Sequence, residues 1–214
     1  MNQVSQISPD VNAPPAAAMV AAPSYPLALS HPTYLVRRSF WSFLGRTTRV
    51  FAPDGSLACY VSQSAFKLRQ ELTLFADEGQ TQPMILMKAR QAIGFSINHD
   101  VFDSRTQQKL GSVRNKGIGF FRDEWELLDA NDQPVGKMLE GGGAILRRVF
   151  PILKNGKWDI DVGGQVCAQV RELWRFFAKE YTLDLSMNQG RLDPRFAIAC
   201  AVLALNREAM RESK

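Results

Sequence analysis

Histidine and cysteine are scarce in this chain of 214 residues, which has two histidines and three cysteines. His31 and His99 lie far apart in the sequence and have no cysteine close by, which excludes a zinc site built from closely spaced ligands. Cys59, Cys167 and Cys200 are odd in number, widely spaced and set in apolar sequence. This arrangement favours buried, reduced thiols in a cytoplasmic protein over a disulfide framework.

Long apolar runs and the common catalytic motifs are also missing. No segment reaches the roughly 20 apolar residues of a membrane-spanning helix, and the residues after Met1 do not resemble a signal peptide. There is no G-x-x-x-x-G-K-[ST] for nucleotide hydrolysis, and residues 94–98 lack the second glycine of G-x-S-x-G. Asp159 and Asp161 share a strand face, which we interpret as a solvated surface. We therefore predict no catalytic residue and no cofactor, with an enzyme site at the mouth of the fold as the less favoured alternative.

Positive charge is in modest excess, with 26 lysines and arginines against 21 aspartates and glutamates and a formal net charge of +5. Such an excess permits binding to an anionic surface, although ordinary solvated basic residues explain it equally well. Two basic pairs have strand spacing, and two further arginines follow Gly141-Gly142-Gly143, where a short helix would present free N–H groups to an anion. The candidate anion-binding or lipid-binding residues are Lys88, Arg90, Arg114, Lys116, Arg122, Arg147 and Arg148.

The first 32 residues are rich in proline, alanine and serine, and we expect them to be a disordered tail. The tail is a plain linker or an adapter that docks a protein partner. The remaining residues, 33–214, are predicted to form one domain.

Within this domain, apolar and polar residues alternate with a period of two along many short segments separated by turns, the pattern of antiparallel strands. Pro53-Asp54-Gly55 is a turn that joins two of them into a hairpin. The predicted strands are 47–52, 56–62, 67–76, 84–89, 95–103, 109–116, 125–129, 134–140, 157–162, 166–172 and 181–186.

The final segment, 193–212, is predicted to be a buried helix. Asp193 is a suitable N-cap, Pro194 fits the first helical position, and no polar side chain occurs from Phe196 to Leu205. A helix that is apolar on every face and too short to span a membrane must be surrounded by protein. We therefore predict a mainly β fold in which about twelve antiparallel strands close into a barrel around this helix. Val202→Asp should then prevent folding.

The order of several motifs resembles the tubby C-terminal-like superfamily, in particular bacterial members of its LURP-one-related and phospholipid scramblase-like group. The matching segments are 50–55 (VFAPDG), 88–90 (KAR), 101–103 (VFD), 123–129 (DEWELLD) and 181–185 (YTLDL), the last of these followed by the apolar helix. The resemblance implies a twelve-stranded barrel with a central helix.

The function that this resemblance implies is recognition of anionic lipid headgroups at a membrane, without catalysis. With the reduced thiols expected of a cytoplasmic protein, we predict a cytoplasmic location at the membrane periphery. Nucleic acid ranks below lipid as a ligand, because the aromatic residues mostly follow the apolar phase of the strands and are not expected to be exposed beside the basic residues. The cysteine cluster that anchors scramblases is missing. Their acidic calcium segment is reduced here to Glu180 and Asp184, which are therefore only weak calcium candidates.

Overall fold

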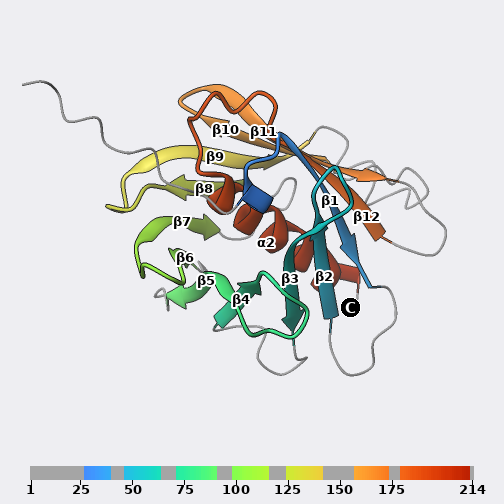
Figure 1. Cartoon of the computed structure of the whole chain (residues 1–214). Helices are drawn as coiled ribbons and strands as arrows, with labels where there is room; N and C mark the ends of the chain where they lie inside the picture. Colours follow the sequence, from blue (N-terminus) through green and yellow to red (C-terminus); the bar gives the residue numbers. More distant parts are fainter. Residues whose placement is uncertain are drawn as a thin grey trace, which may run out of the picture.

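A closed ring of antiparallel strands surrounds the C-terminal helix, as Figure 1 shows. The computed structural model describes residues 27–39, 46–63, 71–90, 98–115, 124–141, 157–173 and 179–212. The twelve strands in these ranges confirm the predicted barrel. They are β1 (Thr33–Arg38), β2 (Arg46–Phe51), β3 (Leu57–Gln63), β4 (Glu71–Phe75), β5 (Pro83–Arg90), β6 (Asn98–Asp103), β7 (Lys109–Asn115), β8 (Glu124–Leu128), β9 (Pro134–Glu140), β10 (Lys157–Val162), β11 (Gln165–Leu173) and β12 (Lys179–Asp184).

The first strand closes the barrel, and the sequence periodicity did not predict it. Leu35 of β1 is paired with Phe51 of β2 on one side and with Thr182 of β12 on the other. Each of the other strands is paired with its neighbours along the chain. Closure therefore gives every strand of the ring a partner on both sides, with β3 and β4 joined by the single register pair of Tyr60 and Phe75.

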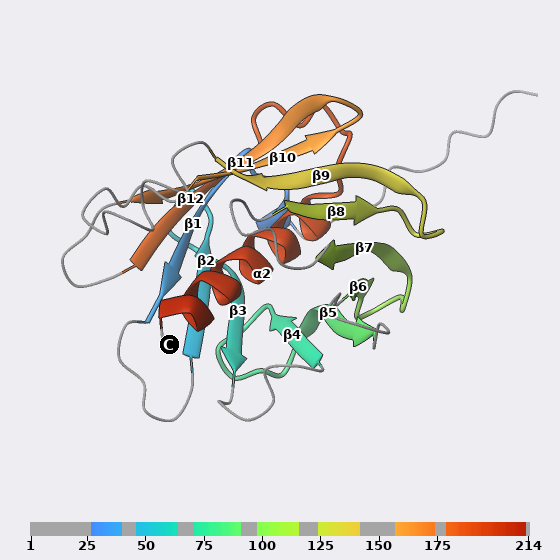
Figure 2. The ribbon, with the colours of Figure 1, turned by 180° about the vertical axis from the view of Figure 1, so that it is seen from behind.

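Helix α2 (Pro194–Glu212) fills the inside of the ring, as the two opposite views in Figures 1 and 2 show. Every residue from Phe196 to Leu205 is buried, which confirms the predicted central helix. The Asp193 carboxylate accepts a hydrogen bond from the backbone N–H of Arg195 at 2.8 Å, as expected of an N-cap. In the described residues, no helix has the length and hydropathy of a membrane span.

The last residues of the predicted tail pack against the barrel. Leu27–Leu29 form a short 3-10 helix (η1), and Leu29 is fully buried in the core. The backbone N–H of Leu185 donates to the carbonyl oxygen of Pro32 at 2.6 Å. The folded unit therefore begins no later than Leu27, whereas the sequence placed its start at residue 33. The rest of the predicted tail, residues 1–26, lies outside the described residues.

The three cysteines are all buried, as predicted. Burial raises the pKa of the Cys59 thiol to about 12, and it also raises the pKa of Cys167 and Cys200. Because the thiolate is the reactive form, these thiols are poor nucleophiles at neutral pH.

Gly136 on β9 has no room for a side chain. A Cβ atom at this position would lie 2.1 Å from the carbonyl oxygen of Asp161 on the neighbouring β10. Gly111 on β7 is similarly tight, because its Cβ would lie 2.6 Å from the carbonyl oxygen of Leu128 and 3.0 Å from the Phe196 ring of α2. Glycine at these two positions lets neighbouring strands, and at Gly111 also the helix, approach closely.

We expect Gly136→Ala to lower the free energy of unfolding by about 3 kcal/mol, the upper range for overpacking, because the obstructing atom belongs to a paired backbone. Urea denaturation measures this loss. The matched control is Gly79→Ala, where the nearest atom, at 2.9 Å, belongs to the side chain of Asp77 and not to the backbone, so we expect a smaller loss. Equal stability of the two variants would contradict the close approach of β9 and β10.

Candidate functional site

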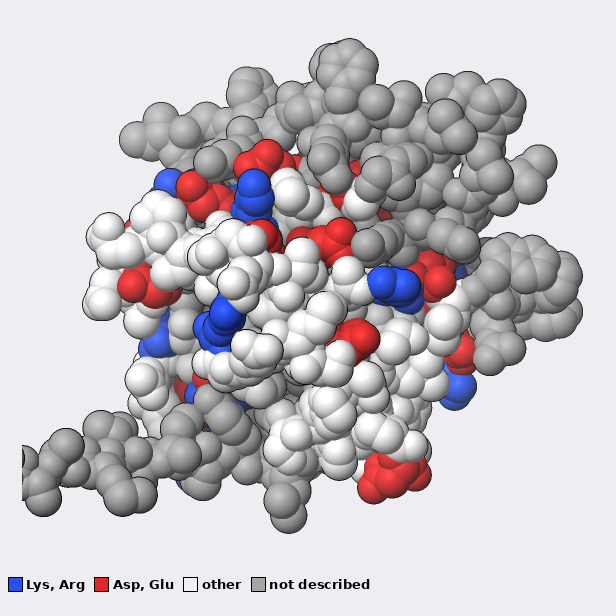
Figure 3. Space-filling view, turned by 90° about the horizontal axis from the view of Figure 1, so that it is seen from above, with Lys and Arg blue, Asp and Glu red and all other residues white. Residues whose placement is uncertain are grey.

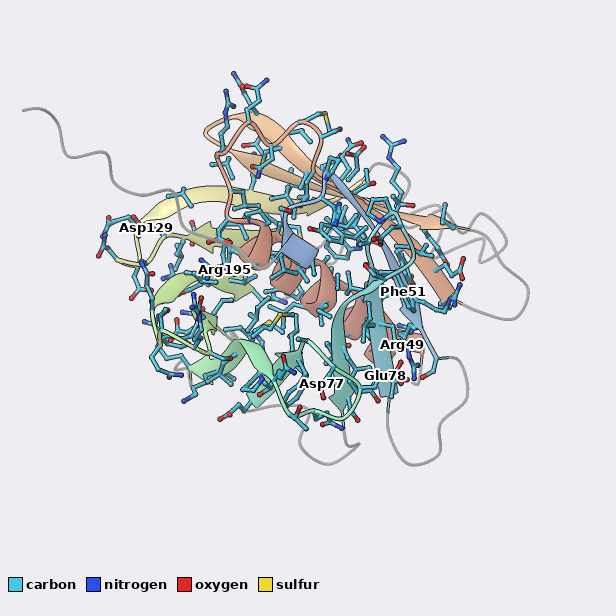
Figure 4. All side chains as sticks on the ribbon, viewed as in Figure 1. Arg49, Phe51, Asp77, Glu78, Asp129 and Arg195 are labelled. Atoms are coloured by element: carbon cyan, nitrogen blue, oxygen red, sulfur yellow. The ribbon has the colours of Figure 1, made fainter. Side chains whose placement is uncertain are left out.

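Two arginines lie side by side on the outer surface of β1 and β2, each over an aromatic ring. Arg37 and Arg49 are direct partners in the β1–β2 register. The guanidinium carbon of Arg37 lies 5.4 Å from the centre of the Phe51 ring, and that of Arg49 lies 5.3 Å from the Tyr60 ring. We call these four residues the arginine wall. Figure 4 labels Arg49 and Phe51 on this side of the barrel.

Each arginine of the wall is held by one carboxylate from a different part of the chain. The Arg37 Nε donates to Glu180 Oε1 of β12 at 2.7 Å. Arg49 donates from Nε and Nη2 to the two carboxylate oxygens of Glu78, both at 2.8 Å. The hydrogen bonds from Arg49 lower the pKa of Glu78, and those to Glu78 raise the pKa of Arg49. Like charges directly opposite each other on paired strands repel, and these carboxylates offset that repulsion.

The turn between β4 and β5 places Glu78 next to Arg49, as Figure 4 shows. Asp77 fixes this turn, because its Oδ1 accepts the backbone N–H of Gln82 at 2.9 Å and that of Thr81 at 3.1 Å. The acidic partner of Arg49 is therefore held in place by backbone hydrogen bonds next to it.

The two arginines differ in what they can still bind. Arg49 uses two of its nitrogens on Glu78. Arg37 uses only Nε, its side chain is 49% exposed, and its terminal nitrogens donate no hydrogen bond within the described part of the chain. Arg37 is thus the better anchor for an anion, because a planar guanidinium can bind a phosphate or carboxylate with two parallel hydrogen bonds.

An open groove of about 450 Å³ lies beside Arg37. Its apolar lining includes Leu35, Phe51 and Pro53, and Thr182 of β12 lies on its other side. The β2–β3 turn that forms one wall is held by a hydrogen bond from the N–H of Gly55 to the carbonyl oxygen of Ala52 at 3.0 Å. The groove thus combines an apolar surface with one cation.

Comparison with known proteins assigns the fold to a family. The LURP-one-related family matches residues 33–205, from the start of β1 to the apolar part of α2. The chain belongs to the LURP-one-related family. A crystal structure of a protein from Arabidopsis thaliana is similar at a TM-score of 0.49 and 15% sequence identity, covering 84% of this chain and 93% of that chain. The curated proteins contain no match.

Of the basic residues predicted as a patch, Arg90 and Arg114 are paired with carboxylates in the described part of this LURP-one-related barrel. Arg90 donates from Nε to Asp100 at 3.0 Å and from Nη2 to Asp132 at 2.7 Å. Arg114 donates to Glu126 at 3.2 Å, whereas Lys88 is exposed on β5. The other candidates, Lys116, Arg122, Arg147 and Arg148, lie outside the described residues. On the face seen in Figure 3, Lys and Arg are likewise scattered among Asp and Glu.

Arg90 belongs to a charge cluster that ties together three strands and the β8–β9 turn. The Lys109 Nζ lies 2.7 Å from Asp132 Oδ1, and the hydroxyl of the fully buried Ser112 donates to Asp100 Oδ1 at 2.7 Å. Hydrogen bonds from Arg90 and then Lys109 hold the pKa of Asp132 well below its ordinary value. Because the two carboxylates balance the two cations, the cluster links the strands and leaves little charge for a ligand.

The two weak calcium candidates of the LURP-one-related chain are not brought together. Glu180 and Asp184 lie four residues apart on β12, roughly 13 Å along a strand. Glu180 binds Arg37, and Asp184 accepts the backbone N–H of Ser186 at 2.9 Å. Ca²⁺ ligands lie about 2.3–2.6 Å from the ion, so one ion cannot contact both. In the described ranges, no group of three or more His, Cys, Asp and Glu residues has the arrangement of a metal site.

Polar side chains inside the barrel hold the carboxyl-terminal part of α2. The buried Arg38 donates from Nη1 to the carbonyl oxygen of Leu205 at 3.0 Å, and the Tyr181 hydroxyl donates to Glu208 at 3.2 Å. Burial, followed by the charge of Glu172, raises the pKa of Glu208. Burial and then the nearby Glu208 raise the pKa of Tyr181. These groups bind one another and the helix, so their evident role is to anchor α2.

Proposed function

We propose that this LURP-one-related barrel is a non-enzymatic binding module that recognises the anionic headgroup of a lipid at a membrane surface. The proposal places the protein in the cytoplasm, at the periphery of the membrane. Its ligand contact is the exposed guanidinium of Arg37 on the arginine wall. This single feature carries the proposal. Arg37 also has a carboxylate partner, Glu180, but uses only Nε on it, whereas Arg90 of the predicted basic patch uses all three guanidinium nitrogens on Asp100 and Asp132.

The filled barrel supports a ligand on the outer surface. The inward-facing side chains of the strands and the apolar face of α2 form one core of buried residues. Because these side chains fill the interior, a ligand has to bind on the outer wall. The wall offers a half-exposed cation on a rigid strand, next to apolar groove residues that can approach the lipid interface.

The net charge of +5 also supports binding to an anionic membrane. Long-range attraction to such a surface acts on the whole molecule, and a basic residue near the membrane contributes about 1 kcal/mol. General attraction of this kind disappears at high salt. A specific contribution from Arg37 would add to it.

We expect the protein to co-sediment with vesicles that contain phosphatidylserine or a phosphoinositide and not with pure phosphatidylcholine vesicles. Arg37→Gln should weaken this binding about fivefold, the equivalent of about 1 kcal/mol for one charge near the membrane. Raising the salt to 1 M should weaken the binding of wild type and variant together, because screening shortens the Debye length to about 3 Å.

The matched control is Arg105→Gln, which removes the same charge from an exposed turn on β6–β7. A thermal melt confirms that both variants are folded. If both lose affinity equally, Arg37 has no specific role, and if neutral vesicles bind as well as anionic ones, headgroup recognition is refuted.

A further inference from the structure

The groove beside Arg37 extends beyond the space that a headgroup on Arg37 would need. Its lining has two parts, an apolar stretch and a cation. We propose that the groove holds the hydrocarbon chain of an anionic amphiphile whose phosphate or carboxylate binds Arg37. This inference rests on the proposed function and specifies its ligand. The groove volume of about 450 Å³ lies within the roughly 300–1,000 Å³ that is typical of small-molecule sites.

The alternation of β1 creates the two-part lining. Successive outward positions of the strand are Thr33, Leu35 and Arg37, which together span roughly 13 Å. All three line the groove, with Phe51 and Pro53 from the β2 side. The apolar side chains therefore lie in the middle of the groove and the cation at one end. An anionic head on Arg37 would direct an attached chain over Leu35 toward Thr33.

Arg37 is oriented before a ligand arrives. Its Nε is bound to Glu180, whose side chain is 9% exposed, and its guanidinium lies over the Phe51 ring. Two different contacts thus fix the plane of the guanidinium, and its terminal nitrogens donate to no other residue in the described ranges. A preorganised donor loses little conformational entropy on binding. Because Phe51 also lines the groove, the same ring contacts the cation and the proposed chain.

A hydrocarbon chain fits this groove better than a peptide does. Peptides that bind along a strand add to a free sheet edge, where backbone hydrogen bonds give affinity. Here β1 is paired on both sides, with β2 and with β12. A peptide in the groove would therefore gain no backbone hydrogen bonds to the sheet. A saturated chain needs only apolar contact.

Isothermal titration of the full-length protein with inorganic phosphate and with n-alkyl phosphates of increasing chain length, each below its micelle concentration, tests the proposal. We expect the affinity to rise up to about fourfold for each methylene buried, and to level off once the chain exceeds the groove. Leu35→Gln should flatten this dependence. Leu86→Gln, which changes a half-buried leucine that faces outward on β5, should leave it unchanged. Arg37→Gln should weaken all chain lengths by the same factor.

The outcomes separate this inference from the proposed function. Equal affinity for phosphate and for long alkyl phosphates, together with binding to anionic vesicles, would overturn the groove and leave headgroup recognition intact. An unchanged chain-length dependence in folded Leu35→Gln would also overturn it, because the chain would then bind elsewhere. Binding to neither alkyl phosphates nor anionic vesicles would overturn both. If Leu35→Gln does not fold, the wild-type series alone still decides whether chain length matters.

Discussion

Val202→Asp is expected to yield a chain that does not fold. Val202 is 1% exposed in the middle of α2 and has buried neighbours on every side of the helix. An unpaired carboxylate in such a site costs several kcal/mol even after the structure relaxes, and the lost apolar contacts add to that cost. A typical domain has only about 5–15 kcal/mol of stability, so the native state should not be populated. Far-UV circular dichroism and the soluble yield measure the effect.

The control for this substitution is Met187→Asp, the same kind of change at a side chain that is 40% exposed. We expect its stability to stay within about 0.5 kcal/mol of wild type. Ile198→Asp, one turn earlier on α2 and fully buried, should behave like Val202→Asp. A soluble Val202→Asp protein with an unchanged thermal midpoint would mean that the helix is not enclosed by the barrel.

The central helix and most strands could be predicted because local pattern and tertiary environment agree. A helix enclosed on all sides is apolar on all sides, and α2 shows this from Phe196 to Leu205. The hairpin strands alternate with a period of two, and their turns carry recognisable residues such as Pro53-Asp54-Gly55. In each case, the residues that determine the structure are close together in the sequence.

Strand β1 could not be predicted because its inner face is not uniformly apolar. Tyr34 and Val36 point into the core, but the third inward position is Arg38, which binds the carbonyl oxygen of Leu205. A buried arginine that caps a carbonyl group 167 residues away breaks the alternation. Only the closed barrel and its central helix explain why a charged side chain is acceptable there.

The candidate site was missed for a related reason. The two-residue spacing of Lys88 and Arg90 along one strand predicted a basic patch. The acidic partners of Arg90, which balance its charge, come from β6 and from a turn 42 residues away. Arg37 meets Phe51 and Glu180 only after β1 has paired with both β2 and β12. One signal was present in the sequence, because Arg49-Val50-Phe51 places an arginine and an aromatic ring on the same strand face. The motif from Val50 to Gly55, which carries the family resemblance, also supplies part of the groove.

Arg195→Met is expected to lower the free energy of unfolding by about 3–5 kcal/mol, the usual cost of removing one partner from a buried ion pair. Arg195 stands in the first turn of α2 with its side chain 11% exposed. It forms an ion pair with Asp103 at the end of β6 and donates from Nη2 to Asp193 at 2.7 Å. Figure 4 labels Arg195 at the start of the helix. The change would leave the buried carboxylate of Asp103 without its cation, and it would remove one polar link between the helix and the barrel wall.

Urea denaturation of matched variants can distinguish the effect of losing the Arg195–Asp103 ion pair from the effect of losing one positive charge. Arg191→Met removes an arginine from the exposed loop before the helix and should cost less than about 0.5 kcal/mol. Asp103 also accepts the backbone N–H groups of Arg105 and Thr106, at 2.8 and 2.9 Å, so Asp103→Asn keeps an acceptor for the turn. If the ion pair connects helix and wall, the double variant Arg195→Met with Asp103→Asn should lose less stability than the sum of the two single changes. Simple additivity, or an Arg195→Met protein as stable as Arg191→Met, would show that the Arg195–Asp103 ion pair does not hold α2 to the wall.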